Sequence, residues 1–205
     1  MISSVGHAQI VSKADGTSVA KVTAGEFYVS IEPVQIMTVL GSCVSACIRD
    51  PDCGVGGINH FMLPVGDSDS ADSWGGNESA INRFGNYAME SLIDAVLALG
   101  GARDRLEIKL FGGGHVLDIN SNVGQKNVDF VLAYLAAEGL PVVSMDVGHD
   151  YARKVVYEPS SGRARMKKLR RIYNGYVAQA ERDLLQDVRK KTAQDSVRLF
   201  ENERG

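Results

Sequence analysis

A cysteine and a histidine stand at the ends of two short apolar segments, where together they could supply a thiol nucleophile and its base. Cys43 ends the stretch TVLGSC (residues 38–43), and His60 lies within GINHFMLP (residues 57–64). A thiol attacks only as the thiolate, and an adjacent imidazole is the usual group that removes its proton. The small residues before the cysteine leave backbone N–H groups free to hold an oxyanion. The pair is therefore a candidate Cys–His acyl-transfer site, provided that two neighbouring strands bring it together.

Each of these residues also has a purely structural interpretation. Cysteine is among the residues most often buried, so Cys43 is equally consistent with a core thiol. His60 lies inside an apolar strand, where a lone histidine is often a hydrogen-bonded core group. Thr38 offers a hydroxyl that could orient the imidazole as the third member of a triad, but threonine is also a β-branched residue that favours strands. The residues alone leave both interpretations open.

Three cysteines close together raise two further hypotheses, a zinc site and a redox pair. Cys43, Cys47 and Cys53 with His60 have the spacings C-x3-C, C-x5-C and C-x6-H, which differ from the short paired knuckles of structural zinc sites. On one continuous strand Cys43 and Cys47 would be about 13 Å apart at roughly 3.3 Å per residue, too far to share a metal. A redox pair is not favoured because no C-x-x-C is present. We therefore expect no metal, no cofactor and reduced thiols.

A triple glycine followed by a histidine, GGGH (residues 112–115), comes directly after an apolar strand. Neither G-x-G-x-x-G nor a Walker lysine accompanies it, so a phosphate-binding turn is not favoured. We interpret the glycines as allowing the backbone to pass close beside the site. His115 and His149 are alternative candidates for the base.

The charge of the chain is unevenly distributed. Residues 1–150 carry 8 basic and 18 acidic side chains, whereas residues 151–205 carry 14 basic and 7 acidic ones. The basic end could meet nucleic acid, an acidic protein face or the acidic part of this chain, or it could be a solvated helix surface. No apolar run approaches the roughly 20 residues that span a bilayer, and no secretory signal is visible. With the odd number of cysteines, this predicts a cytoplasmic protein.

The periodicity of apolar residues predicts the elements that position these groups. Residues 1–25 are expected to be weakly ordered, residues 26–170 to form the main domain, and residues 171–205 to form a basic helical extension. Residues 64–79 are expected to be a surface loop. Strands are predicted at 27–31, 37–40, 44–48, 55–63, 106–111, 142–147, 152–157 and 163–169, and helices at 81–99, 124–138 and 174–203. A mixed sheet with helices, an α/β sandwich, accommodates this order.

The stretch TVLGSCVSACIRDPDCGVGGINHFMLP (residues 38–64) resembles the CheD family, the chemoreceptor glutamine deamidases of bacterial chemotaxis. The likeness continues in order through FGGGH (111–115), GQKN (124–127), DVG (146–148), Arg153 and the Gly162 turn. It covers about residues 27–169, by several separate motifs. His149 stands where a second glycine is usual.

The resemblance implies a three-layer α/β/α sandwich with a cysteine nucleophile, Cys43, and a histidine base, His60. It also implies a threonine as third member, for which Thr38 is the nearest candidate. The implied activity is hydrolysis of glutamine side chains to glutamate on the cytoplasmic helices of methyl-accepting chemotaxis receptors, without a cofactor. The family also contacts CheC-type phosphatases in some systems, so a non-enzymatic adaptor or regulator is the alternative. For the basic extension we hypothesise a role in recruiting the receptor.

Overall fold

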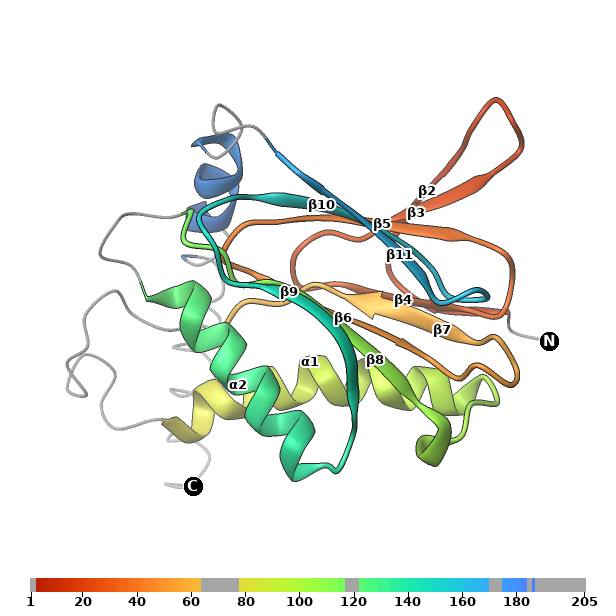
Figure 1. Cartoon of the computed structure of the whole chain (residues 1–205). Helices are drawn as coiled ribbons and strands as arrows, with labels where there is room; N and C mark the ends of the chain where they lie inside the picture. Colours follow the sequence, from red (N-terminus) through yellow and green to blue (C-terminus); the bar gives the residue numbers. More distant parts are fainter. Residues whose placement is uncertain (1–2, 64–77, 117–121, 170–174, 184–185, 187–205) are drawn as a thin grey trace, which may run out of the picture.

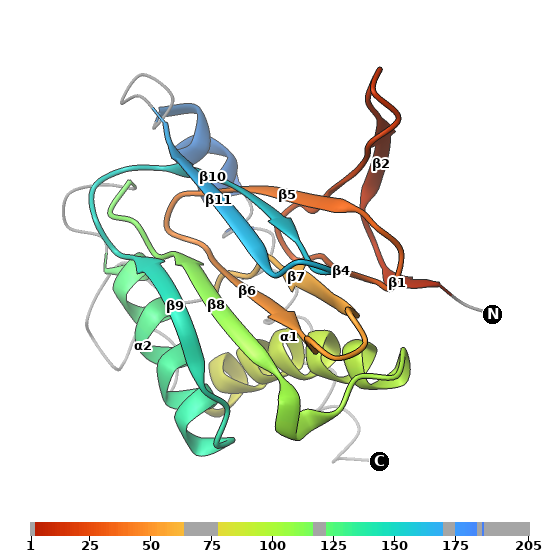
Figure 2. The same ribbon diagram turned by 45° about the vertical axis from the view of Figure 1, so that its right-hand side comes forward.

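Two β-sheets and two long helices form three layers in the computed structural model, which describes residues 3–63, 78–116, 122–169, 175–183 and 186. One sheet has six strands in the order β1-β4-β7-β6-β8-β9, and the other has five in the order β11-β10-β5-β3-β2. Figures 1 and 2 show α1 and α2 on one face of the six-stranded sheet, with the five-stranded sheet across its other face. No helix among the described residues is both long and apolar enough to cross a membrane.

The elements have the following bounds. The strands are β1 (Ser4–Gly6), β2 (Gln9–Ser12), β3 (Ser18–Lys21), β4 (Phe27–Ser30), β5 (Gln35–Leu40), β6 (Val44–Arg49), β7 (Gly56–Asn59), β8 (Glu107–Gly112), β9 (Val142–Val147), β10 (Arg153–Glu158) and β11 (Arg163–Lys168). The helices are α1 (Glu78–Ala98), α2 (Val123–Ala137) and the 3-10 helix η2 (Arg103–Arg105), and residues 175–183 are also helical.

The predicted α/β class with a mixed sheet is confirmed, because β3 and β5 pair in parallel, as do β8 and β9, whereas the other pairs are antiparallel. The predicted α/β/α order of layers differs from the observed one, since the layer opposite α1 and α2 is a sheet. The reason lies in strands such as β10, whose residues alternate between fully and partly buried. A mainly antiparallel sheet with one buried and one half-exposed face can form an outer layer without helices to cover it.

Residues 4–21 form three strands where a weakly ordered segment was predicted, so that prediction is wrong for them. β1 pairs with β4, β2 and β3 form an antiparallel pair, and β3 continues the sheet beside β5. Each is only three or four residues long, too short to show a clear alternation, and it is ordered by pairing with longer strands. The predicted 64–79 loop, up to residue 77, and the predicted helix beyond residue 186 lie outside the described residues.

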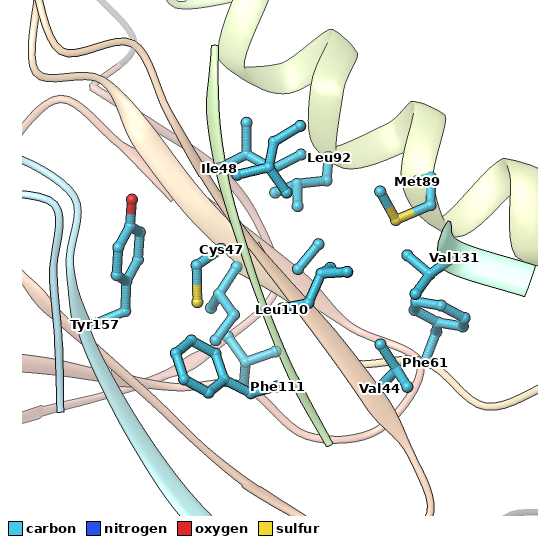
Figure 3. Packing of buried hydrophobic residues seen from close by; sticks show 14 of the residues in the cluster. Val44, Cys47, Ile48, Phe61, Met89, Leu92, Leu110, Phe111, Val131 and Tyr157 are labelled. Atoms are coloured by element: carbon cyan, nitrogen blue, oxygen red, sulfur yellow. The ribbon is translucent and has the colours of Figure 1, made fainter. Parts of the chain in front are cut away.

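β6 separates the two halves of the core, because its side chains alternate between the two faces of the sheet. Figure 3 shows Cys47 on the side of Tyr157, which comes from the five-stranded sheet, and Ile48 on the side of Leu92 from α1. All four side chains are 0–1% exposed. Burial raises the pKa of the Cys47 thiol, so this cysteine is a core residue that stays protonated.

Candidate active site

The candidate Cys–His pair lies where the chain passes from the five-stranded sheet to the six-stranded sheet. Gly41–Cys43 connects β5 to β6, and His60 directly follows β7, the antiparallel neighbour of β6. Val44 and Phe61 form an antiparallel bridge in which each N–H donates to the other's carbonyl oxygen at 3.0 Å. Cys43 and His60 directly precede the two members of this bridge. The expectation that neighbouring strands bring them side by side is therefore met.

Thr38 determines which nitrogen of His60 carries the proton. Its buried hydroxyl oxygen lies 2.9 Å from the carbonyl oxygen of Val22 and 2.8 Å from Nδ1 of His60. A carbonyl can only accept, so the single hydroxyl proton is donated to Val22, and Nδ1 of neutral His60 must donate its proton to Thr38. The lone pair is then on Nε2, which is buried and has no hydrogen-bond partner among the described residues. Nε2 is thus the nitrogen that can take a proton from a neighbouring group.

Both members of the pair are neutral in this arrangement. Burial raises the pKa of the Cys43 thiol well above its ordinary value, and the nearby carboxylate of Glu181 raises it further. Burial also lowers the pKa of His60 to about 4. The structure therefore holds a thiol next to a free imidazole base, and the proton has to move during the reaction rather than before it.

The triple glycine holds the connection that carries Cys43. The N–H of Gly113 donates to the carbonyl of Cys43 at 2.7 Å, and the N–H of Gly114 donates to the carbonyl of Gly41 at 2.7 Å. A Cβ atom at Gly112, where φ is +112°, would lie 2.1 Å from the Cys43 carbonyl oxygen. The interpretation of these glycines as a close backbone passage beside the site is confirmed.

Asn127 of α2 ties both halves of the site together. Its side-chain amide donates to the carbonyl of Ser42 at 2.9 Å and accepts the N–H of Leu63, three residues after His60, at 2.8 Å. The residue is fully buried. In the sequence it stands out only as part of the GQKN motif, although an asparagine on the otherwise apolar buried face of a helix is a signal of such a role.

Glu181 also lies in the site, although no motif in the sequence indicates it. It lies in the helix of residues 175–183, drawn in blue in Figure 1, at the end of the molecule where β5 and β8 end. One carboxylate oxygen accepts the N–H groups of Gly41 and Cys43 at 2.8 and 3.1 Å. The other accepts the N–H and the hydroxyl of Ser42 at 2.8 and 2.7 Å. The N–H groups predicted to hold an oxyanion are therefore occupied by a carboxylate, and only 5% of Glu181 is exposed.

Ligand atoms of Cys43, His60 and Glu181 all lie within 4.8 Å of one another, a separation that would suit a metal ion. The carboxylate of Glu181, however, already accepts four hydrogen bonds, which uses about all of its lone pairs. The three backbone N–H groups and the hydroxyl that donate to this carboxylate form a pocket for an anion, not for a metal ion. The four-residue zinc set considered from the sequence is not assembled, since Cys47 is in the core and the thiol of Cys53 contacts the carbonyl of Gly100 at 3.7 Å.

His115 and His149, the alternative candidates for the base, make contacts outside the Cys43 site. His115 is exposed, and its backbone N–H donates to the backbone carbonyl of His149 at 2.7 Å. The ring of His149 stacks on Tyr151 with 5.1 Å between ring centroids. His149 also has a φ of +67°, the left-handed conformation that glycine adopts most easily. Among the described residues, His60 is thus the histidine that the fold brings to Cys43.

The amino-acid sequence is similar to those of several known proteins. A family model described as "CheD chemotactic sensory transduction" matches residues 62–168. A protein of Hydrogenovibrio crunogenus named "Probable chemoreceptor glutamine deamidase CheD" is 45% identical over 191 residues, which are 93% of this chain and 98% of that protein. A protein of the same name from Halorhodospira halophila is 50% identical over 182 residues, 88% of this chain and 84% of that one. The segment matched by the family model begins after Cys43 and His60, so their roles depend on the geometry described above.

Proposed function

This chain belongs to the CheD family, and we propose that it hydrolyses specific glutamine side chains to glutamate on methyl-accepting chemotaxis receptors. The relatives are named as chemoreceptor glutamine deamidases, which supports this substrate. The observation that carries the proposal is the hydrogen bond from His60 to Thr38, because it leaves Nε2 of His60 as a free base beside the Cys43 thiol.

The first half of the reaction forms a thioester. Nε2 of His60 takes the thiol proton of Cys43 as the sulfur attacks the carboxamide carbon of the substrate glutamine. A carbon–sulfur bond forms, and the carboxamide oxygen becomes an oxyanion that the N–H groups of Gly41–Cys43 stabilise. Protonated His60 then gives its proton to the departing ammonia, which leaves a glutamyl thioester on Cys43.

The second half of the reaction releases glutamate. Nε2 of His60 takes a proton from water, and the resulting hydroxide attacks the thioester carbon. The carbon–sulfur bond breaks and Cys43 recovers its proton from His60. Overall, one glutamine and one water become one glutamate and one ammonia. Each turnover places a carboxylate on the receptor where a neutral amide stood.

The remaining expectations extend this proposal. The substrate helices are cytoplasmic, so the protein acts in the cytoplasm. A CheC-type phosphatase is a proposed partner, and residues 26–170 are proposed as the catalytic domain. The basic, helical extension predicted at residues 171–205 lies largely outside the described residues. Among the described residues of that extension, 175–183 are helical and reach the candidate site.

The proposed activity is tested by mass spectrometry of a purified receptor cytoplasmic fragment from the same cell, incubated with this protein. We expect conversion of particular glutamines to glutamate, and none when the protein is omitted. If no glutamine is converted while the fragment is still bound, the non-enzymatic adaptor or regulator is the better description. A pull-down for a CheC-type partner would then be the next experiment.

The hydroxyl of Thr38 gives a second prediction. Thr38→Val removes the acceptor for Nδ1 of His60, so the ring loses its fixed orientation and tautomer. We expect deamidation to slow by about 10- to 100-fold, as for other groups that orient a functional histidine. Thr38→Ser keeps the hydroxyl and should restore most of the rate. Equal deamidation rates in the valine and serine variants, at equal urea midpoints, would show that the hydroxyl of Thr38 has no part in the mechanism.

A further inference from the structure

The pocket beside the Cys43 thiol is filled by a side chain with the structure of the product. Deamidation yields a glutamate side chain, and a glutamate side chain from this chain's own C-terminal helix is what the structure shows there. Its carboxylate accepts three backbone N–H groups and the hydroxyl of Ser42. One of its oxygens lies within 4.8 Å of the Cys43 sulfur and of a His60 ring nitrogen.

We propose that residues 175–183 are an internal competitor of the receptor helix, with Glu181 in the place of the substrate side chain in its product form. This inference depends on the proposed function. It adds how a helix presents the substrate side chain to Cys43, and how access of the receptor to the site is controlled. A receptor glutamine enters the pocket only when this helix leaves it.

The way in which the helix of residues 175–183 carries Glu181 to the site supports the inference. Ala178 and Glu181, three residues apart, are buried on the face that meets the site, while Tyr176 on the other side is 77% exposed. A glutamate side chain thus reaches the thiol from the surface of an intact helix. Receptor substrates are helices with the glutamine at their surface, so the pocket can accept the same side chain from a receptor in the same way.

Gly41 lets the end group of such a side chain come close to the backbone of the pocket. A Cβ atom at this position would lie 2.6 Å from a carboxylate oxygen of Glu181. The absence of a side chain at Gly41 is therefore what lets the carboxylate approach its backbone N–H at 2.8 Å. A substrate carboxamide needs the same approach for its oxygen to become a stabilised oxyanion.

The hydrogen bonds also explain why a glutamate, rather than a glutamine, is a stable occupant. Both oxygens of Glu181 face backbone donors, whereas the NH2 group of a glutamine in the place of the second oxygen would face the N–H of Ser42, with only the hydroxyl oxygen of Ser42 to accept from it. A carboxylate has no ammonia to release, so it stays unreacted. Its negative charge beside Cys43 also disfavours the thiolate. The occupied site is therefore inactive by both occlusion and charge.

The first test measures receptor deamidation by the full-length Glu181→Ala variant. An attached competitor acts at a high effective concentration, so its removal should lower KM for the receptor fragment about tenfold and leave kcat unchanged. Asp183→Asn is the matched control, because it removes an exposed carboxylate from the same helix and should leave KM unchanged. An unchanged KM in Glu181→Ala, or a lowered kcat, would overturn the inference.

The second test asks whether position 181 is a substrate position. In Glu181→Gln, Cys43 can attack the introduced carboxamide, release ammonia and, after water hydrolyses the thioester, leave glutamate at this position. We expect mass spectrometry of the purified variant to show conversion to glutamate, and the Cys43→Ala/Glu181→Gln double variant to keep its glutamine.

The outcomes of this second test separate the two proposals. If the variant keeps its introduced glutamine while it converts receptor glutamines, the helix is not bound as a substrate, and the deamidase function stands. If neither is converted, the proposed function fails and the inference fails with it. Conversion in the Cys43→Ala double variant would also contradict the inference, since the reaction would then not use the site.

Discussion

Replacing Cys43 by alanine is expected to abolish receptor deamidation, with a loss of at least about a thousandfold, as when the nucleophile of a triad is removed. Cys43 is the thiol beside the free Nε2 of His60 and the N–H groups of Gly41–Cys43. Without the sulfur no thioester can form, although the pocket and the base remain. Binding of the receptor fragment should persist, because alanine keeps the backbone that forms the pocket. The rate is measured by mass spectrometry of the fragment, and binding by calorimetry.

Cys47→Ala is the matched control for this prediction. It removes a second fully buried thiol four residues away, on the side of β6 that faces Tyr157. We expect a lower urea midpoint from the cavity but an unchanged rate for the folded protein. Comparable loss of activity in both variants would mean that Cys43 acts through stability. Conversion of the receptor by Cys43→Ala would move the chemistry to another group.

The central pair could be predicted from the sequence because its geometry is local. Cys43 and His60 are 17 positions apart, and strand patterns on both sides place them on neighbouring strands. The same is true of the glycines at 112–114, whose close approach to the site follows from their position after a strand. The alternation of apolar residues along the strands and the glycines that follow a strand were sufficient to predict both features.

Two features could not be predicted because they depend on contacts between distant parts of the chain. Glu181 meets Gly41 across 140 positions, and its own helix shows only a narrow apolar stripe, which does not indicate where the helix binds. The outer five-stranded sheet includes β3, a strand of four residues that is ordered by its partner β5. Local patterns carry no information about such pairing, and the helices expected in that layer were implied by the family resemblance alone.

Loss of the Arg153 side chain should have the largest effect on folding. Its fully buried guanidinium donates to the carboxylate and carbonyl of Asp146 and to the carbonyl of Gly148. Arg153→Met removes this cation. The partly buried carboxylate of Asp146 then keeps only the weaker contact with the hydroxyl of Tyr151 at 3.3 Å, and the two carbonyls lose the guanidinium donor. Breaking a buried pair in this way typically costs about 3–5 kcal/mol, a large share of the stability of a domain of this size.

Arg165→Met is the matched control, because it removes the same side chain from a pair at the surface. The Arg165 side chain is 54% exposed and lies 2.5 Å from Glu158, so its loss should cost at most about 1 kcal/mol. Urea unfolding of both variants at constant m measures the difference. Equal midpoints would show that the Arg153 cluster adds no more stability than a pair at the surface. The cluster also reaches the site, because the N–H of Gly148 donates to the carbonyl of Gly112 at 2.9 Å. Since Gly112 lies against Cys43, Arg153→Met should lower the deamidation rate of the protein that remains folded, whereas Arg165→Met should not.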